Sequence, residues 1–534
     1  MKIKRETLIL ILIFLLGALI RIYLSCNETF IGSDAVVYTR LGKNLIESGR
    51  YLFGENFNLG IYFPPGYPVF VGLINLFLKD LFISGKMVSL FFSLISIFLF
   101  YSIGKELDNR ESGLFAAFAY AIYPTSIIVT TLKAQSEGTF FFFIFFSIYL
   151  FMVSKRRNSF FIYASLGLSI GIAYLTRPEG LLLLLLPFLT FVDNNPLKNK
   201  RYLFKVCVAF MTFILIISPY LLFLKRSTGE FKISGKQNMG MAIERDANIK
   251  SKKGLDETIF SLNKEKTQLR FFNTGTSIFS YIFKNLFENP SKFIKHFLNN
   301  VKDEIEILGI GLIPIILPLF FSFFRRDLFK KKNMLLFILF PFLFGGLYSL
   351  FPIQKRFMGS MVLSLILFSS VGFANSQSAF SNIFDFCKIK RNKIILFLEK
   401  HIKYIIIIML ILSSFLYYAV FRSKSEIPTE HIKAGYFLKN NISSEYEKLN
   451  IMSLAPWISF YSDSRFTYLP YANYSDMINF AKLYHVDYIV VDERLLSEWD
   501  FYDEFLHMEK YSDDVKLIYE DNSGKLIKMF KVNY

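Results

Sequence analysis

The sequence contains repeated apolar runs of about one membrane thickness, separated by short charged stretches. A helix needs roughly 20 apolar residues to cross a hydrocarbon core about 30 Å thick, so each run predicts a membrane-spanning helix. We expect about eleven spans. They lie near residues 8–24, 86–104, 111–131, 137–153, 159–175, 180–192, 203–224, 304–324, 334–351, 357–374 and 403–421. The expected fold class is therefore a polytopic α-helical membrane protein.

Lysine and arginine collect in short clusters between these runs. With the N-terminus in the cytoplasm, every short cluster falls on the cytoplasmic side, as the positive-inside rule requires. The clusters are residues 105–110, 155–158, 198–201, 325–333 and 387–393. An odd number of spans then places the chain from about residue 422 outside the cytoplasm. We expect a multi-pass plasma-membrane protein with a cytoplasmic N-terminus and an extracytoplasmic C-terminal domain.

The formal net charge of +18 raises the question of a nucleic-acid partner. No basic stripe with interleaved aromatic residues stands apart from the hydrophobic runs, so we expect none. The first run, residues 8–24, could also be the apolar region of a signal peptide because basic residues precede it. It is about as long as a full span, and Arg21 stands where a cleavage site needs small residues. We therefore expect a retained first helix.

Three regions are too polar to cross the membrane. The first outer loop, residues 25–85, contains two segments with helical periodicity that are too short or too polar to span, so we expect interfacial helices there. A long outer loop covers residues 225–303. The region 425–534 alternates strand-like stretches such as "DYIVVD" with a helical segment at 474–484 and a hairpin turning at 522–524. We expect a membrane domain at 1–424 and a small soluble α/β domain at 425–534.

Carboxylates gather at the outer ends of the predicted spans. Asp34 follows the first span, Glu137 opens the fourth, and Glu179 lies beside Arg177 in "LTRPEG". Ionisable groups so close to hydrocarbon are costly and usually mark a substrate or ion path. Structural alternatives remain open for three of them: a helix N-cap for Asp34, a dipole-stabilised helix start for Glu137, and snorkelling towards headgroups for Arg177.

Two cations break the positive-inside pattern. Lys355 and Arg356, in "QKRF", fall on the outer side. An anionic ligand such as a phosphate would explain them, since guanidinium and ammonium groups bind phosphate oxygens. The alternative is contact with lipid headgroups.

The order and sidedness of these features resemble a known family. An acid after the first span, "PPGYP" before the second, an acid opening the fourth, "LTRPEG" and a late outward "QKRF" together resemble the membrane glycosyltransferases of the GT-C fold. The likeness is to the branch that includes the protein O-mannosyltransferases and the aminoarabinose transferases of lipid A. It covers residues 5–200 well and the "QKRF" region less well.

The resemblance implies an activity. Such enzymes take a sugar from a polyprenyl phosphate and transfer it, outside the cytoplasm, to a lipid, glycan or protein acceptor. It implies that Asp34 is the catalytic carboxylate and that Glu137 corresponds to the second acid. Within this scheme we expect two further groups of residues. Arg177, Lys355 and Arg356 would bind the donor phosphate, and Tyr38, Tyr67, Lys133 and Glu179 would contact substrate.

Two departures prevent a specific substrate from being inherited. Protein O-mannosyltransferases carry adjacent acidic residues in the first loop, whereas Ala35 follows Asp34 here. Aminoarabinose transferases have a lysine in the later part of that loop, where this chain reads "NLGIYFPPGYP".

These carboxylates and cations suit the chemistry of sugar transfer. A carboxylate can deprotonate the acceptor while nearby cations stabilise the leaving phosphate, which suits an inverting single displacement. A divalent metal such as Mg²⁺ or Mn²⁺ could also lie between Asp34 and Glu137, because both supply hard oxygen ligands. Two other functions remain open: a transporter or flippase, which would place charges in mid-span and often repeat its halves, and a polymerase or ligase of lipid-linked glycans.

Overall fold

The computed structural model describes the chain in two compact units. Unit 1, the helical unit, contains Met1–Thr29, Gly85–Arg226 and Pro290–Ser423, and unit 2, the α/β unit, contains Phe30–Ser84, Ser227–Asn289 and Lys424–Tyr534. The described residues are 5–534 without 55–57, 132–133, 158, 195–199, 236–255, 258, 270–285, 289, 325–339, 341–342, 350–357, 422–425, 443–447, 498 and 500–512. Both outer loops expected from the sequence contribute to the same unit as the C-terminal domain.

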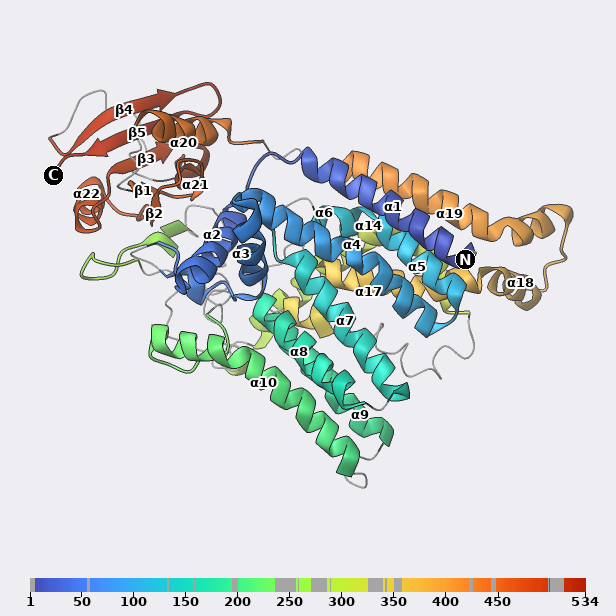
Figure 1. Cartoon of the computed structure of the whole chain (residues 1–534). Helices are drawn as coiled ribbons and strands as arrows, with labels where there is room; N and C mark the ends of the chain where they lie inside the picture. The colour runs from blue at the N-terminus through green and yellow to red at the C-terminus, as the bar shows by residue number, and fades with distance from the viewer. Residues whose placement is uncertain are drawn as a thin grey trace. The chain divides into compact units, whose positions relative to one another are not determined.

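The helical unit is a bundle of long apolar helices (Figure 1). Its elements are α1 (Arg5–Cys26), α4 (Leu81–Leu107), α5 (Arg110–Ile122), α6 (Pro124–Thr130), α7 (Glu137–Arg156), α8 (Phe160–Thr176), η2 (Pro178–Leu184), α9 (Leu185–Asn194), α10 (Lys200–Thr228), α14 (Pro290–Leu312), η3 (Ile313–Ile315), α15 (Ile316–Ser322), α17 (Gly359–Ala374), α18 (Ser376–Phe386) and α19 (Lys393–Phe421). α4 begins in the α/β unit, four residues before the boundary between the units.

Fewer of these helices meet the length and hydropathy of a span than the sequence predicts. Within the described residues five do, or up to seven if each of two bent pairs counts as one span. The bends are 57° between α5 and α6 and 70° between α17 and α18. The predicted span at 180–192 starts as the 3₁₀ segment η2, and most of the predicted span at 334–351 lies outside the described residues. The expected count of eleven is therefore not confirmed.

A buried arginine compensates the break between α5 and α6. Pro124 has no N–H to continue the ladder, so carbonyls at the end of α5 lack helical partners. Arg21 of α1 donates to the carbonyl oxygens of Ala121 at 2.6 Å and Tyr120 at 3.0 Å, and to the Ser93 hydroxyl at 2.8 Å. The charge in the first apolar run thus stabilises the broken helix inside the bundle.

The α/β unit begins with two helices that cross closely. α2 (Ser33–Ser48) ends at Gly49, which adopts the left-handed conformation of a C-cap, and α3 (Gly66–Leu78) follows after the short η1 (Leu59–Ile61). A Cβ on Gly42 would lie 2.2 Å from the carbonyl oxygen of Pro68, and one on Gly72 would lie 2.3 Å from the carbonyl oxygen of Gly42. Glycine is therefore required at both positions for the backbones to approach.

The crossing gives the first prediction. Gly42→Ala should lower the free energy of unfolding by about 1–3 kcal/mol, because an overpacked methyl group must push the two helices apart. Thermal unfolding in detergent measures this effect. Gly309→Ala is the matched control, since no described atom outside its own stretch of helix lies within 4 Å of the added Cβ. Equal melting temperatures for the two variants would contradict the requirement for glycine at position 42.

The C-terminal part of this unit is a five-stranded sheet with helices on both faces (Figure 1). Its elements are α20 (Thr429–Asn441), β1 (Asn450–Ser453), α21 (Trp457–Tyr461), β2 (Arg465–Tyr468), α22 (Tyr474–Leu483), β3 (Tyr488–Asp492), α23 (Glu493–Leu496), β4 (Val515–Asp521) and β5 (Ile527–Val532). The strand order is β2-β1-β3-β5-β4. β1 pairs in parallel with β2 and β3, whereas β5 is antiparallel to β3 and β4.

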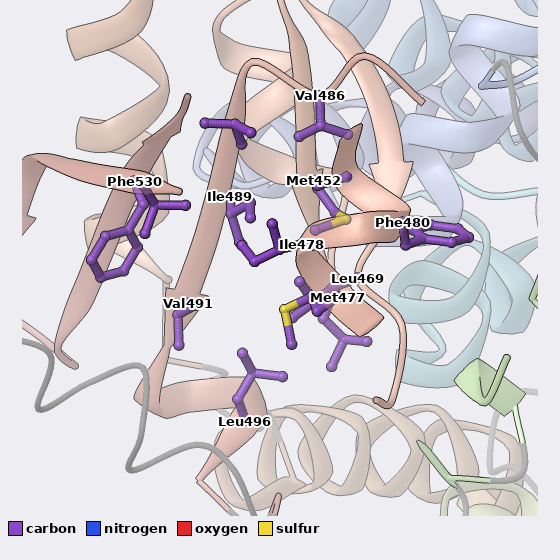
Figure 2. Packing of buried hydrophobic residues seen from close by; sticks show 14 of the residues in the cluster. Met452, Leu469, Met477, Ile478, Phe480, Val486, Ile489, Val491, Leu496 and Phe530 are labelled. Atoms are coloured by element: carbon purple, nitrogen blue, oxygen red, sulfur yellow. The ribbon is translucent and has the colours of Figure 1, made fainter. Parts of the chain in front are cut away.

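Alternating side chains of the strands enter two separate cores. Met452, Ile489 and Phe530 pack with Ile478 and Phe480 of α22, as Figure 2 shows. Their neighbours along the strands, which include Ile451, Val490 and Met529, pack with Ala434 and Leu438 of α20 on the other face. Because both faces are covered, every residue of the central strands β1 and β3 is buried, whereas the edge strand β4 is mostly partly buried or exposed.

Candidate active site

Asp34 lies in the first turn of α2. The N-cap position belongs to Gly32, and no side chain in the described part of the chain caps this helix end. The N-cap alternative for Asp34 is therefore wrong, although a carboxylate in the first turn is still favoured by the helix dipole. Burial, and then the charge of Asp34, raise the pKa of Tyr468 at the end of β2. Asp34 thus lies within electrostatic range of the C-terminal sheet.

Tyr38 of α2 and Tyr67 of α3 pack the two helices against each other. The exposed fraction is 4% for Tyr38 and 0% for Tyr67, and their rings meet edge to face at a centroid distance of 5.3 Å. Tyr38 makes a second edge contact, at 5.0 Å, with Phe63 of the "FPPGYP" segment. These contacts explain how the aromatic and proline-rich segment before α3 fixes the helix that carries Asp34. Direct contact of the two tyrosines with substrate stays a prediction.

Glu137 and Arg177 form a buried ion pair in the helical unit. Arg177 Nη2 lies 2.5 Å from Glu137 Oε1, and Arg177 Nε donates to the Ser136 hydroxyl at 3.2 Å. The guanidinium also lies 5.9 Å from the ring centroid of Phe140. The exposed fraction is 1% for Glu137 and 8% for Arg177. Arg177 therefore points into the bundle, and the snorkelling alternative is wrong.

Local sequence explains where the pair forms. Glu137 is the first residue of α7, where the helix dipole favours a carboxylate. Arg177 is the C-cap of α8, and Pro178 after it prevents the helix from continuing. Glu179, in η2, is half-buried, and its Oε2 has no hydrogen-bond partner among the described residues. Two helix ends separated by 40 residues thus bring opposite charges together inside an apolar bundle.

Two further polar groups of the helical unit were not predicted from the sequence. Glu304 of α14 is 5% exposed, and a Cβ on Gly345 would lie 3.1 Å from its Oε2. One turn earlier, Asn300 Nδ2 donates to the carbonyl oxygen of Ser349 at 2.9 Å. Tyr348 lies within electrostatic range of Glu137, Arg177 and Glu179. The four-residue spacing of Asn300 and Glu304 was the available signal, because it places both on one helix face.

The remaining site predictions have different outcomes. Lys133, Lys355 and Arg356 lie outside the described residues. Asp34 belongs to the α/β unit and Glu137 to the helical unit, so their joint action stays a prediction. In the described part of the chain no group of three or more His, Cys, Asp or Glu side chains could hold a metal ion. A metal held by Asp34 and Glu137 alone, with the donor phosphate, likewise stays a prediction.

Comparison with known proteins identifies the fold. Residues 63–223 match the family model of the dolichyl-phosphate-mannose-protein mannosyltransferases. The search of curated proteins gave no match.

Solved structures match almost the whole chain. The oligosaccharyltransferase AglB from Archaeoglobus fulgidus, in complex with an inhibitory peptide and a dolichol-phosphate, is similar with a TM-score of 0.60 at 13% identity, over 96% of this chain and 72% of that chain. ArnT from Cupriavidus metallidurans, bound to undecaprenyl phosphate, is similar with a TM-score of 0.60 at 12% identity, over 97% of both chains. The chain therefore has the fold of the GT-C membrane glycosyltransferases, and its residues 63–223 carry the sequence pattern of the dolichyl-phosphate-mannose-protein mannosyltransferases.

Proposed function

We propose that this protein transfers a sugar from a polyprenyl-phosphate donor to a lipid, glycan or protein acceptor on the outer face of the plasma membrane. The observation that carries the proposal is the similarity over 97% of both chains to ArnT bound to undecaprenyl phosphate. The buried guanidinium of Arg177 supports it, because a cation held inside an apolar bundle can stabilise the phosphate end of a lipid donor.

The proposed reaction is a single displacement. The Asp34 carboxylate removes the proton from an acceptor hydroxyl or amine, and that atom forms a bond to the anomeric carbon. The bond from the anomeric carbon to the phosphate oxygen breaks, polyprenyl phosphate leaves with the bonding electrons, and the anomeric configuration inverts. Arg177, Lys355 and Arg356 stabilise the charge that develops on the leaving phosphate. In this scheme the N-terminus is cytoplasmic and the α/β unit is extracytoplasmic.

A transfer assay tests the function directly. The full chain is reconstituted in liposomes with a radiolabelled polyprenyl-phosphate sugar, and label is followed into glycolipid, glycan and protein fractions. Mass spectrometry of glycolipids and glycoproteins from cells with and without the chain identifies the acceptor class. Appearance of a chain-dependent glycosylated product supports the proposal. Movement of intact donor across the bilayer without loss of its sugar would instead indicate a flippase.

The outer cations give the second prediction. Arg356→Ala should raise the KM for the polyprenyl-phosphate sugar about tenfold with a smaller effect on kcat. Most of the charge-assisted hydrogen bond to the phosphate is already made when the donor binds, and the chemical step loses only the strengthening of that bond as the leaving phosphate gains charge. Steady-state kinetics with varied donor measures both constants. Arg157→Ala, at an exposed position expected to face the cytoplasm, is the control. Unchanged kinetics for Arg356→Ala would assign that arginine to lipid headgroups.

A further inference from the structure

The carboxyl edge of the C-terminal sheet has the geometry of a ligand-binding edge. The three parallel strands β1, β2 and β3 all end at this edge, at Ser453, Tyr468 and Asp492. From β1 the chain crosses to β2 on one side and then returns to β3 on the other. Open α/β sheets bind ligands outside the carboxyl ends of their strands at such a reversal of strand order. This edge belongs to the same unit as α2.

The segment that leads into α2 packs beside this edge. Phe30 meets Trp457, which follows β1, edge to face at a centroid distance of 5.1 Å. Ile31 is fully buried. Further along the first loop, the ring of Phe53 lies 5.7 Å from that of Phe466 in β2. Aromatic contacts therefore hold the first loop against α21 before the helix that carries Asp34 and against β2 after it.

Arg40 fixes α2 relative to β2. Its Nη2 donates to the carbonyl oxygen of Ser459 at 2.5 Å and its Nη1 donates to that of Ser464 at 2.7 Å. Ser464 immediately precedes β2. Burial lowers the pKa of Arg40 to about 10, and the charge of Asp463 opposes that shift, so the guanidinium stays charged at neutral pH. Two charge-assisted hydrogen bonds thus set the position of α2 along the strand.

Tyr468 is the last residue of that strand. It pairs with Ser453 of β1, and its ring packs against Phe466 at 4.7 Å and Phe260 at 5.4 Å. The aromatic neighbours restrict the ring, so the phenol has a defined place at the carboxyl edge. A phenol is protonated at neutral pH, and the raised pKa of Tyr468 takes it further from ionisation, so its hydroxyl can donate a hydrogen bond.

We propose that Tyr468 is a positioning residue for the Asp34 carboxylate, brought to the start of α2 by the C-terminal domain. Its hydroxyl orients the carboxylate towards the acceptor hydroxyl or amine, and Arg40 holds the helix and the strand in the register that this requires. The inference rests on the proposed function, because it assigns Tyr468 to the group proposed as the base. It adds to that function a residue of the C-terminal sheet, to which the family resemblance assigns no role.

The test separates positioning from packing. Tyr468→Phe keeps the ring and removes the hydroxyl, so we expect kcat for sugar transfer to fall about tenfold while the donor KM and the melting temperature stay unchanged. Tyr471→Phe is the matched control, since this tyrosine packs on Trp499 at 4.9 Å, and its kcat should equal that of the wild type. In the Asp34→Asn background, Tyr468→Phe should add no further loss, because both residues act through one carboxylate.

The possible outcomes test the role of Tyr468 separately from the proposed sugar transfer. Unchanged kcat for Tyr468→Phe together with an inactive Asp34→Asn variant would overturn the role of Tyr468 and leave the function standing. If Tyr468→Phe lowers the melting temperature enough for unfolding to account for its lost activity, Tyr468 serves packing alone. Full activity of Asp34→Asn would remove the proposed base, and the inference with it.

Discussion

Asp34→Asn is expected to lower kcat for sugar transfer by about a thousandfold and to leave the protein folded in the membrane. Asparagine has the shape of aspartate but cannot accept the acceptor's proton at neutral pH. The free energy of unfolding should fall only slightly, because Asp34 does not cap α2 and its interaction with the helix dipole is worth about 0.3–1 kcal/mol.

The measurement is transfer of radiolabelled sugar in liposomes, with the melting temperature recorded on the same preparation. Glu47→Gln is the matched control, because it removes an exposed carboxylate from the same helix. Its activity should equal that of the wild type. If Asp34→Asn transfers sugar within about twofold of the wild type, a general base at this position is excluded.

Breaking the ion pair between Glu137 and Arg177 should have the largest effect on stability. Arg177→Met leaves the buried Glu137 carboxylate without its 2.5 Å partner, so we expect the free energy of unfolding to fall by about 3–5 kcal/mol. The double variant Glu137→Leu with Arg177→Met removes both charges and should recover most of that loss. It should remain inactive, since neither the cation nor the carboxylate is present.

Unfolding of the purified protein in detergent measures these differences. The control pair is Lys105 and Glu6, whose Nζ and Oε1 atoms lie 3.3 Å apart and whose side chains are 45% and 20% exposed. Lys105→Met should lower the free energy of unfolding by less than about 1 kcal/mol. Equal free energies of unfolding for Arg177→Met and the double variant would show that the unpaired Glu137 carboxylate does not destabilise the fold. Activity in the double variant would remove both residues from the reaction.

The sequence predicted the elements whose signal is local. The strands in "KLNIMSLA" and "DYIVVD" and the hairpin turning near residue 523 lie where β1, β3, β4 and β5 are found. Their apolar character and turn residues sufficed. β2 was not predicted, because the mostly polar segment "SDSRFTY" lacks the apolar run that marks β1, and the strand is fixed by its pairing with β1.

The candidate site was predicted less completely, because its contacts join residues that are far apart in the sequence. Asp34, Glu137 and Arg177 stood out because each interrupts an apolar pattern. Their partners did not, since the Glu137–Arg177 pair depends on two helix ends meeting, and the relation of Tyr468 to Asp34 depends on how a distant strand packs. The third predicted span, residues 111–131, was expected as one helix, but it bends at Pro124, and only the packing of α1 shows that Arg21 satisfies the exposed carbonyls.

The α/β unit is assembled from three stretches of chain, and this determines when it can be completed during synthesis. Arg40 of α2 finds its carbonyl partners 419 and 424 residues further along the chain. On the ribosome, the first stretch is made long before the last one, and the intervening helices must enter the bilayer in between. A nascent chain, or one truncated before residue 459, therefore carries Asp34 on a helix without these two hydrogen bonds, and the α/β unit is completed only after residues 459–464 have been made.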